Sequence, residues 1–197
     1  FNVFSQMSEI GIMAAGAALV IIIGGIDLSV GAVLAVSLML NAWLYRDFGV
    51  PFVISTLAGL ALGAFVGLVN GILSTYGRIQ PFVATLATMS ACSGLALFIT
   101  NGSPVTGFPE WFSEITSARF LGLPLEFVIL VVVYLVVAYW LYFRPSGRAL
   151  YAIGGNEEVA RLSGINTRRA KVMVYVTAGF LAALAGLIVG SRLDAAH

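Results

Sequence analysis

Charge is scarce in this chain. Asp, Glu, Lys and Arg make up 10% of its 197 residues, whereas 60% of the residues are hydrophobic and the mean hydropathy is +1.01. Soluble domains carry roughly 25% charged residues, so the composition excludes an ordinary soluble domain and indicates an integral membrane protein. The ten Lys and Arg residues nearly balance the nine Asp and Glu residues. The chain therefore has no excess of basic residues of the kind that would indicate a nucleic-acid partner.

Cysteine, histidine and catalytic motifs are also scarce. The lone Cys92 lies in an apolar run, which excludes internal disulfides and Cys-based metal motifs and favours a packing role. The single histidine is the last residue, His197, and neither HExxH nor GxSxG occurs. A GxxxxGK[ST] phosphate-binding loop is absent too. We therefore expect no catalytic residue, no metal site and no cofactor in this chain, and any ATP-driven motor would have to lie in another subunit.

What the chain has in abundance is long apolar stretches. A helix that crosses the hydrocarbon core of a bilayer needs about 20 apolar residues, and backbone groups in lipid must be bonded within the segment. The sequence therefore predicts an all-α, polytopic bundle of about six membrane helices in a single domain, 1–197. The expected helices cover residues 8–25, 28–45, 51–75, 81–100, 123–143 and 171–191.

The charges indicate an orientation, because short cytoplasmic loops are enriched in Lys and Arg. Residues 144–171 hold six Lys or Arg against two Glu, a net charge of +4, so this loop is expected in the cytoplasm. Residues 101–122 have a net charge of −1 and are expected outside. The same alternation places the Arg78 turn inside and the Arg46–Asp47 turn outside. The motif GGIDLSVG, residues 24–31, then lies near the cytoplasmic side or forms a break at membrane depth.

Glycine recurs every four residues within the third apolar stretch, at Gly59, Gly63, Gly67 and Gly71. This spacing places all four on one helix face, and small residues let membrane helices approach closely. The pattern predicts a packing face rather than the wall of a pore.

Asp27 stands out because an ionised carboxylate at membrane depth is costly and marks a functional site by default. Asp27 and Ser29 precede a helix that should begin near Val30, and both side chains can accept hydrogen bonds from N–H groups at a helix start. Gly24 and Gly25 allow the preceding helix to end tightly. We favour a structural role for Asp27, which is to fix a break between two helices, over direct contact with a substrate.

A short amphipathic helix is predicted within the basic loop. Asn156 is suited to an N-cap, Glu157 and Glu158 fall in the first turn, Arg161 falls in the last turn and Gly164 suits the C-terminal stop. Val159 and Leu162 share a face. Because so short a helix is marginal in water, it either lies on lipid headgroups or docks onto a cytoplasmic protein.

Four segments carry a resemblance to a known family. GGIDLSVG (24–31), GLVNGILSTYGRIQPFVATLATM (67–89), NGSPV (101–105) and GRALYAIGGNEEVARLSGI (147–165) resemble, in order and spacing, the permease subunits of ribose-type ABC importers. These are multi-pass proteins of the bacterial inner membrane that carry monosaccharides. The resemblance covers almost the whole chain.

The resemblance implies several partners. It implies a second permease subunit, two cytoplasmic ABC ATPase subunits, a periplasmic sugar-binding protein and membrane lipid. Within the cytoplasmic loop, 144–170, it identifies residues 156–163 as the coupling helix that docks onto the ATPase through Asn156, Glu157, Glu158, Val159, Arg161 and Leu162. Family members are longer at both ends, so the chain is expected to be partial. A truncated, inactive membrane subunit is therefore one alternative.

A sugar path needs polar groups that bond hydroxyls. Candidates for the path or the helix break are Gly25, Asp27, Ser29, Asn70 and Thr85, with Thr88, Ser90 and Ser93 nearby. Each of the hydroxyl and amide groups has a simpler interpretation, in which it bonds the backbone or a neighbouring helix. Trp111 and Phe112 in the external loop could meet the binding protein, or lie at the membrane interface as aromatics often do.

The main alternative function is a secondary transporter driven by an ion gradient. Such transporters keep ionisable groups inside the bundle for the coupling ion. Residues 79–109 contain no Asp, Glu, Lys or Arg, which weakens this alternative.

Overall fold

The computed structural model describes residues 2–102, 107–109, 111–112, 118–120 and 122–194. Its main elements are helices, with one short antiparallel pair of strands, β1 (Arg119–Phe120) and β2 (Leu123–Pro124). The helices are α1 (Asn2–Ile22), α2 (Val30–Arg46), α3 (Phe52–Thr75), α4 (Pro81–Thr100), α6 (Leu125–Phe143), α7 (Pro145–Gly155), α8 (Glu157–Leu162) and α9 (Thr167–Asp194).

Each of the six predicted membrane segments corresponds to a helix, which confirms the all-α membrane fold. Among the described residues, α3, α4, α6 and α9 are long and apolar enough to cross a membrane. The other two, α1 and α2, are apolar but shorter, over Met7–Ile22 and Val30–Arg46.

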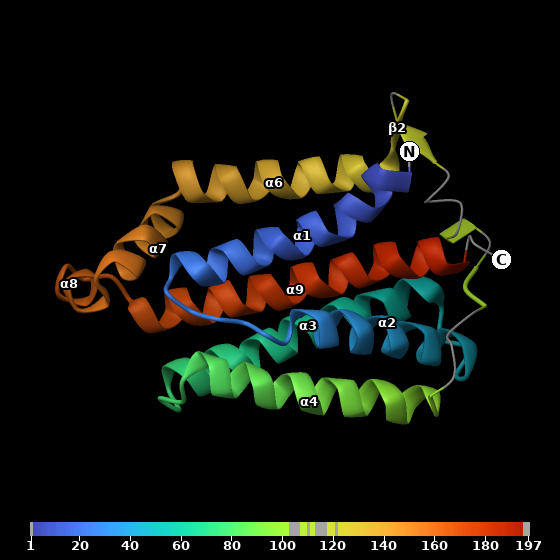
Figure 1. Ribbon diagram of the computed structural model, residues 1–197, viewed down its shortest axis with the longest axis horizontal. Coiled ribbons are helices and arrows are strands. Elements are labelled where there is room, and N and C mark those ends of the chain that lie inside the picture. Colours follow the sequence, from blue (N-terminus) through green and yellow to red (C-terminus); the bar gives the residue numbers. More distant parts are fainter. Residues whose placement is uncertain (1, 103–106, 110, 113–117, 121, 195–197) are drawn as a thin grey trace.

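Helix α9 occupies the centre of the bundle and packs against α1, α2 and α3 (Figure 1). Helix α4 lies against α2 and α3 on one side, and α6 lies against α1 on the other. Helices α7 and α8 and the α3–α4 turn lie at one end of the bundle, whereas the start of α1, the end of α9 and the β1–β2 pair lie at the opposite end (Figure 1). We call these the α8 end and the β end.

The predicted glycine face of α3 is confirmed as a packing surface. A Cβ atom added to Gly63 would lie 2.6 Å from the carbonyl oxygen of Gly179 on α9. One added to Gly71 would lie 2.9 Å from the Cα of Val172. Because backbone atoms block these positions, only glycine permits the observed approach of α3 and α9.

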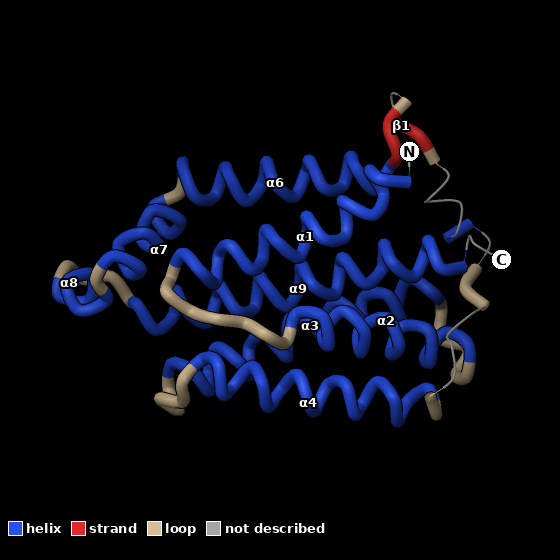
Figure 2. The backbone as a smooth tube through the Cα atoms, viewed as in Figure 1, coloured by secondary structure: helices blue, strands red, loops and turns tan. Residues whose placement is uncertain are grey.

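The chain between α1 and α2 is not a tight turn. Residues 23–29 leave the end of α1 and run back along the bundle, so α2 begins well inside it (Figure 2). Gly24 has φ +74°, and its N–H donates to the carbonyl of Ile21. This left-handed residue ends α1, as expected for glycine at this position. The break therefore runs from the end of α1 into the bundle (Figure 2), and its depth in the membrane stays a prediction.

Helix α7 was not predicted from the sequence, because residues 144–155 were expected to form a loop. Pro145 occupies the first turn, where its missing N–H costs nothing. Leu150 and Ile153 share a face and are both buried. Glycine lowers helix propensity, but Gly147 and Gly154 lie where α7 closely approaches the backbone of α6 and of α1.

Candidate functional site

Five side chains form a polar cluster where the α1–α2 break meets α3 and α4: Asp27, Ser29, Asn70, Thr85 and Thr88. The Asn70 amide donates to the Ser29 hydroxyl over 2.9 Å, and the Thr88 hydroxyl donates to Asn70 Oδ1 over 2.7 Å. The Ser29 hydroxyl in turn donates to Asp27 Oδ1 over 2.6 Å. These hydrogen bonds join three separate segments of the bundle: the break, α3 and α4.

This polar cluster is buried inside the bundle. Ser29, Asn70 and Thr85 are fully or almost fully buried, while Asp27 and Thr88 are partly buried. Asn70 lies five residues before the end of α3, which corresponds to roughly 8 Å of helix at 1.5 Å per residue. Polar groups at this depth have no bulk water to bond, so their mutual hydrogen bonds fasten the break to α3 and α4.

The structure corrects the expected capping of α2. Ser29 is the N-cap residue, but its side chain makes no capping hydrogen bond to α2. Asp27 accepts from the Ser29 N–H over 2.8 Å rather than from a later N–H of the helix. Both side chains hold the turn before α2, because the Ser29 hydroxyl is directed to Asp27 and Asn70.

The remaining polar candidates divide into two groups. The Thr85 hydroxyl donates to the carbonyl of Pro81 over 2.8 Å and lies 3.5 Å from the carbonyl of Ile26 in the break. Ser90 and Ser93 are exposed on α4, outside the polar cluster, and Ser90 donates to the carbonyl of Leu86. No local pattern of residues separates these two groups in the sequence.

Gly25 lies where the break meets α9. A Cβ atom there would lie 2.6 Å from the hydroxyl of Tyr175, a side chain that is almost fully buried. A side chain at this position would therefore crowd the buried side chains of Tyr175 and Val20.

The short helix α8 forms as the sequence predicts. The Asn156 side chain accepts from the N–H of Val159 over 3.0 Å and caps the helix. Gly164, with φ +85°, follows the helix, and the N–H of Ile165 donates to the carbonyl of Ala160. These are the N-terminal and C-terminal signals that the residue pattern indicated.

Helix α8 is anchored on one face and exposed on the other. Ala160 is buried in a core cluster with Leu150 and Ile153 of α7. On the outer face, the side chains of Val159 and Leu162 are 57% and 74% exposed. An exposed apolar ridge on a fixed helix is a feature of a docking surface.

The charges on α8 are paired. Glu158 bonds Arg161 within the helix, and Glu157 bonds Lys171 on α9 over 2.5 Å. A hydrogen bond from Arg161, assisted by its positive charge, holds the pKa of Glu158 below its ordinary value. The Lys171 ammonium donates to the Glu157 carboxylate, and this pair ties α8 to the start of the central helix.

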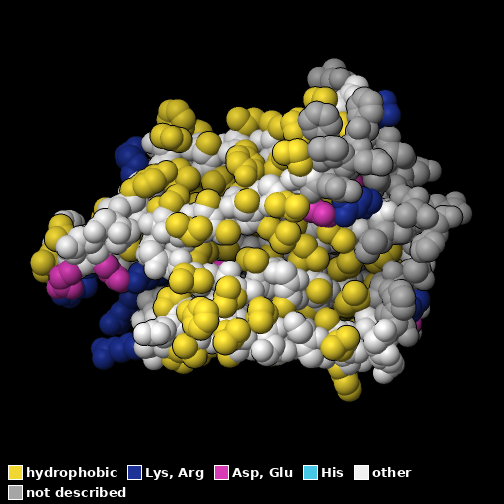
Figure 3. Space-filling view, viewed as in Figure 1, with side chains coloured by type: hydrophobic (Ala, Val, Ile, Leu, Met, Phe, Trp, Pro, Cys, Tyr) yellow, Lys and Arg dark blue, Asp and Glu magenta, His cyan; other side chains and the backbone are white. Residues whose placement is uncertain are grey.

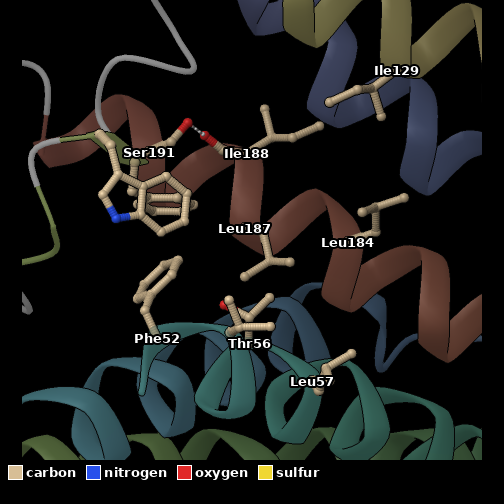
Figure 4. A pocket seen from close by; sticks show the side chains of 11 residues that line it. Phe52, Thr56, Leu57, Ile129, Leu184, Leu187, Ile188 and Ser191 are labelled. Atoms are coloured by element: carbon tan, nitrogen blue, oxygen red, sulfur yellow. Dashed lines mark hydrogen bonds between the residues drawn. The ribbon is translucent and has the colours of Figure 1, made fainter. Parts of the chain in front are cut away.

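A cavity of about 260 Å³ lies near the β end, between α3 and α9 (Figure 4). Its lining is aliphatic and aromatic apart from two hydroxyls. Thr56 accepts from Asn41, and Ser191 donates to the carbonyl of Ile188. A sugar needs several converging polar groups, so this cavity does not suit one.

The two aromatic residues of the 101–122 loop, Trp111 and Phe112, differ in their exposure. Phe112 is 4% exposed and packs against Phe52 and Phe108, with ring centroids 4.7 Å and 5.3 Å away. Trp111 is 51% exposed. Of the two, Trp111 alone remains a candidate to contact another protein. Contact with a binding protein stays a prediction, because residues 103–106, 110 and 113–117 of this loop lie outside the described part of the chain.

Metal ligands do not converge in the part of the chain that the structure describes. No three His, Cys, Asp or Glu side chains there lie close enough to hold an ion. The polar cluster offers hydroxyl, amide and carboxylate groups that can bond a neutral polyol.

The fold and these sites define a class: a polytopic helical membrane protein with a helix break inside the bundle and a short helix with an exposed apolar ridge at one end. Over residues 1–197 the chain matches the family described as branched-chain amino acid transport system / permease component. The chain belongs to this permease family.

Individual relatives are named for sugars. The ribose import permease protein RbsC of Bacillus subtilis is 44% identical over 198 residues, covering 100% of this chain and 61% of that protein. RbsC of Escherichia coli K12 is 43% identical over 204 residues, covering 100% of this chain and 62% of the relative. The D-allose transport system permease protein AlsC of E. coli K12 is 34% identical over 196 residues, covering 100% of this chain and 60% of the relative. No solved structure matches the chain.

Proposed function

We propose that this chain is part of the membrane-spanning subunit of an ABC importer for a small sugar of the ribose type, in a bacterial inner membrane. The observation that carries the proposal is its similarity, over its whole length, to permeases named for ribose import. The chain spans 61% and 62% of those relatives, so the activity, the substrate and the partners of the whole protein are part of the proposal.

In this proposal, helix α8 is the docking element for a separate ATPase that binds ATP and Mg²⁺. Its exposed ridge, Val159 and Leu162, enters the ATPase, while Ala160 and the Glu157–Lys171 pair hold α8 on the bundle. Closure of the ATPase moves α8, and the bundle changes the side to which it opens. A second permease subunit and a periplasmic binding protein complete the transporter.

The polar cluster has two roles in this proposal. In the state described, its members bond one another and hold the α1–α2 break against α3 and α4. When the bundle opens, the same hydroxyl and amide groups line part of the sugar path. This arrangement suits a neutral substrate, since it supplies donors and acceptors beside a single carboxylate, Asp27.

Co-purification of the protein in its natural length with its ATPase subunits tests the docking role. Leu162→Asp should lower ATPase association more than about 10-fold, because it puts a charge into an apolar contact. Tyr151→Asp is the matched control, since Tyr151 is an exposed aromatic on α7 at the same end. Retained association in L162D, or equal loss in both variants, would contradict the docking role.

Sugar uptake after collapse of the proton gradient, with ATP maintained, separates the ABC importer from a secondary transporter. Uptake of labelled ribose should continue, since ATP drives it. Uptake that stops with the gradient would favour the secondary transporter.

A further inference from the structure

A second cavity, of about 420 Å³, opens at the α8 end between the α3–α4 turn and helices α8 and α9. Its charged residues are four cations, Arg78, Arg161, Arg168 and Lys171, and two carboxylates, Glu157 and Glu158. We call it the basic pocket. Lys and Arg side chains gather at this end of the molecule (Figure 3).

The carboxylates of the basic pocket are already matched. Glu158 pairs with Arg161, and Glu157 pairs with Lys171. Neither Arg78 nor Arg168 is paired with a carboxylate within the described residues, so the pocket keeps a net charge of +2. The guanidinium of Arg168 lies over the ring of Tyr76, 5.6 Å from its centroid, and this stacking holds it in place.

Two further features favour an anion in the basic pocket. Helices α4 and α9 both begin at its wall, at Pro81 and Thr167, and helix N-termini carry partial positive charge. The hydroxyl oxygen of Thr75 is buried at the same wall and has no hydrogen-bond partner among the described residues. A phosphate oxygen would supply an acceptor for that hydroxyl.

The surface next to the basic pocket is apolar. Ile79 lines the pocket, and Phe82, Val83 and Leu86 follow it along the exposed side of α4. These side chains lie on a helix that is long and apolar enough to cross the membrane. A ligand that fits both surfaces has a phosphate at one end and hydrocarbon chains at the other.

We propose that the basic pocket binds the headgroup phosphate of an anionic phospholipid, with its acyl chains on the exposed face of α4. Basic pockets between membrane helices on the cytoplasmic side are suited to anionic headgroups. A free phosphate would use the cations alone, whereas a phospholipid would contact both the cations and the apolar side chains of α4.

The test uses the protein in its natural length, purified in a neutral detergent so that no charged membrane surface is present. Phosphatidylglycerol or phosphatidylcholine is added, and bound lipid per chain is measured by native mass spectrometry. The R78Q/R168Q variant should lower retention of phosphatidylglycerol about 30-fold. The matched control, R144Q/R148Q, removes the same charge from exposed arginines outside the pocket and should retain the lipid. R78K/R168K keeps the charge and should restore most of the binding.

Several results would overturn the proposal. They are equal retention of both lipids by the unaltered protein, equal loss in R78Q/R168Q and the control, or displacement of phosphatidylglycerol by inorganic phosphate alone at similar concentration. The last would identify a free anion as the ligand. Loss of the ATPase subunits, but not of lipid, in R78Q/R168Q would assign the pocket to the ATPase interface. The comparison of lipids and phosphate needs no variant, so it stands even if R78Q/R168Q folds poorly.

Discussion

Gly67→Ala should destabilise the bundle strongly for a change of one methyl group. A Cβ atom at Gly67 would overlap the carbonyl group of Tyr175 and would lie 2.9 Å from the Cα of Val176. Both obstacles are backbone of α9, which cannot rotate away as a side chain can. The overlap can be removed only if α9 moves away from α3. That movement would loosen the contacts of Gly63 and Gly71 along the same face.

Gly67→Ala should lower the free energy of unfolding by about 1–3 kcal/mol, the usual range for overpacking a well-packed interior. The loss should lie at the upper end of this range because the backbone of α9 is rigid. Gly94→Ala is the matched control. Gly94 also lies within a membrane helix, α4, but nothing lies within 4 Å of a Cβ atom added there. Both changes raise helix propensity equally, so the difference between the variants isolates the α3–α9 contact.

Reversible unfolding in mixed micelles, followed by tryptophan fluorescence against the mole fraction of a denaturing detergent, measures the two free energies of unfolding. G94A should be as stable as the unaltered protein or up to about 1 kcal/mol more stable, because alanine has the higher helix propensity and the added methyl group touches nothing. If G67A is as stable as G94A, then α3 and α9 are not in the contact described, and the packing argument fails.

Three further predictions concern the polar cluster and α8. Asp27→Asn should largely preserve assembly and sugar uptake, because one side-chain oxygen accepts both bonds from Ser29 and an amide oxygen can do the same; complete loss of uptake in a well-folded variant would contradict a mainly structural role. Asn156→Ala should cost α8 about 1 kcal/mol through loss of its cap, seen as faster amide exchange in α8, whereas Asn156→Ser should retain most of the protection. The pKa of Glu158 is held below the ordinary glutamate value of 4.5 by Arg161. The Glu158–Arg161 pair therefore stabilises α8 at pH values above 4.5, and this stabilisation is lost as the pH falls below that value. Amide protection of α8 should therefore hold from about pH 7 to about pH 5 and fall below that range; a loss that begins above about pH 6 would contradict the pairing.

The features that sequence predicted well are local or periodic. The apolar stretches located the membrane helices, because helix length in lipid is set by bilayer thickness. The four-residue glycine spacing predicted the packing face of α3, although it did not identify α9 as the helix opposite. Asn156 and Gly164 set the two ends of α8 correctly, because capping involves residues only a few positions apart.

The features that sequence missed depend on contacts between distant residues. Asn70 and Ser29 are 41 positions apart, and Thr88 lies 18 positions beyond Asn70. No local pattern selects these partners from the other hydroxyls, which is why the sequence could not distinguish Thr88 from Ser90. The expected cap by Ser29 was wrong for the same reason, since the bond to Asn70 competes with a bond to the start of α2.

The positions of α7 and the break connect the proposed docking helix to the polar cluster. Gly154 of α7 meets the backbone of Ile22, the last residue of α1. The break begins directly after Ile22 and is fastened at its far end by Ser29 to Asn70. A displacement of α8 that is passed through α7 would therefore act on the start of the break, while α3 and α4 hold its end. A rigid turn between α1 and α2 would pass such a displacement to α2 as a whole. An extended segment held by a few hydrogen bonds can instead change its path when they break, so the polar cluster is the part of the bundle best placed to respond to the proposed docking at α8.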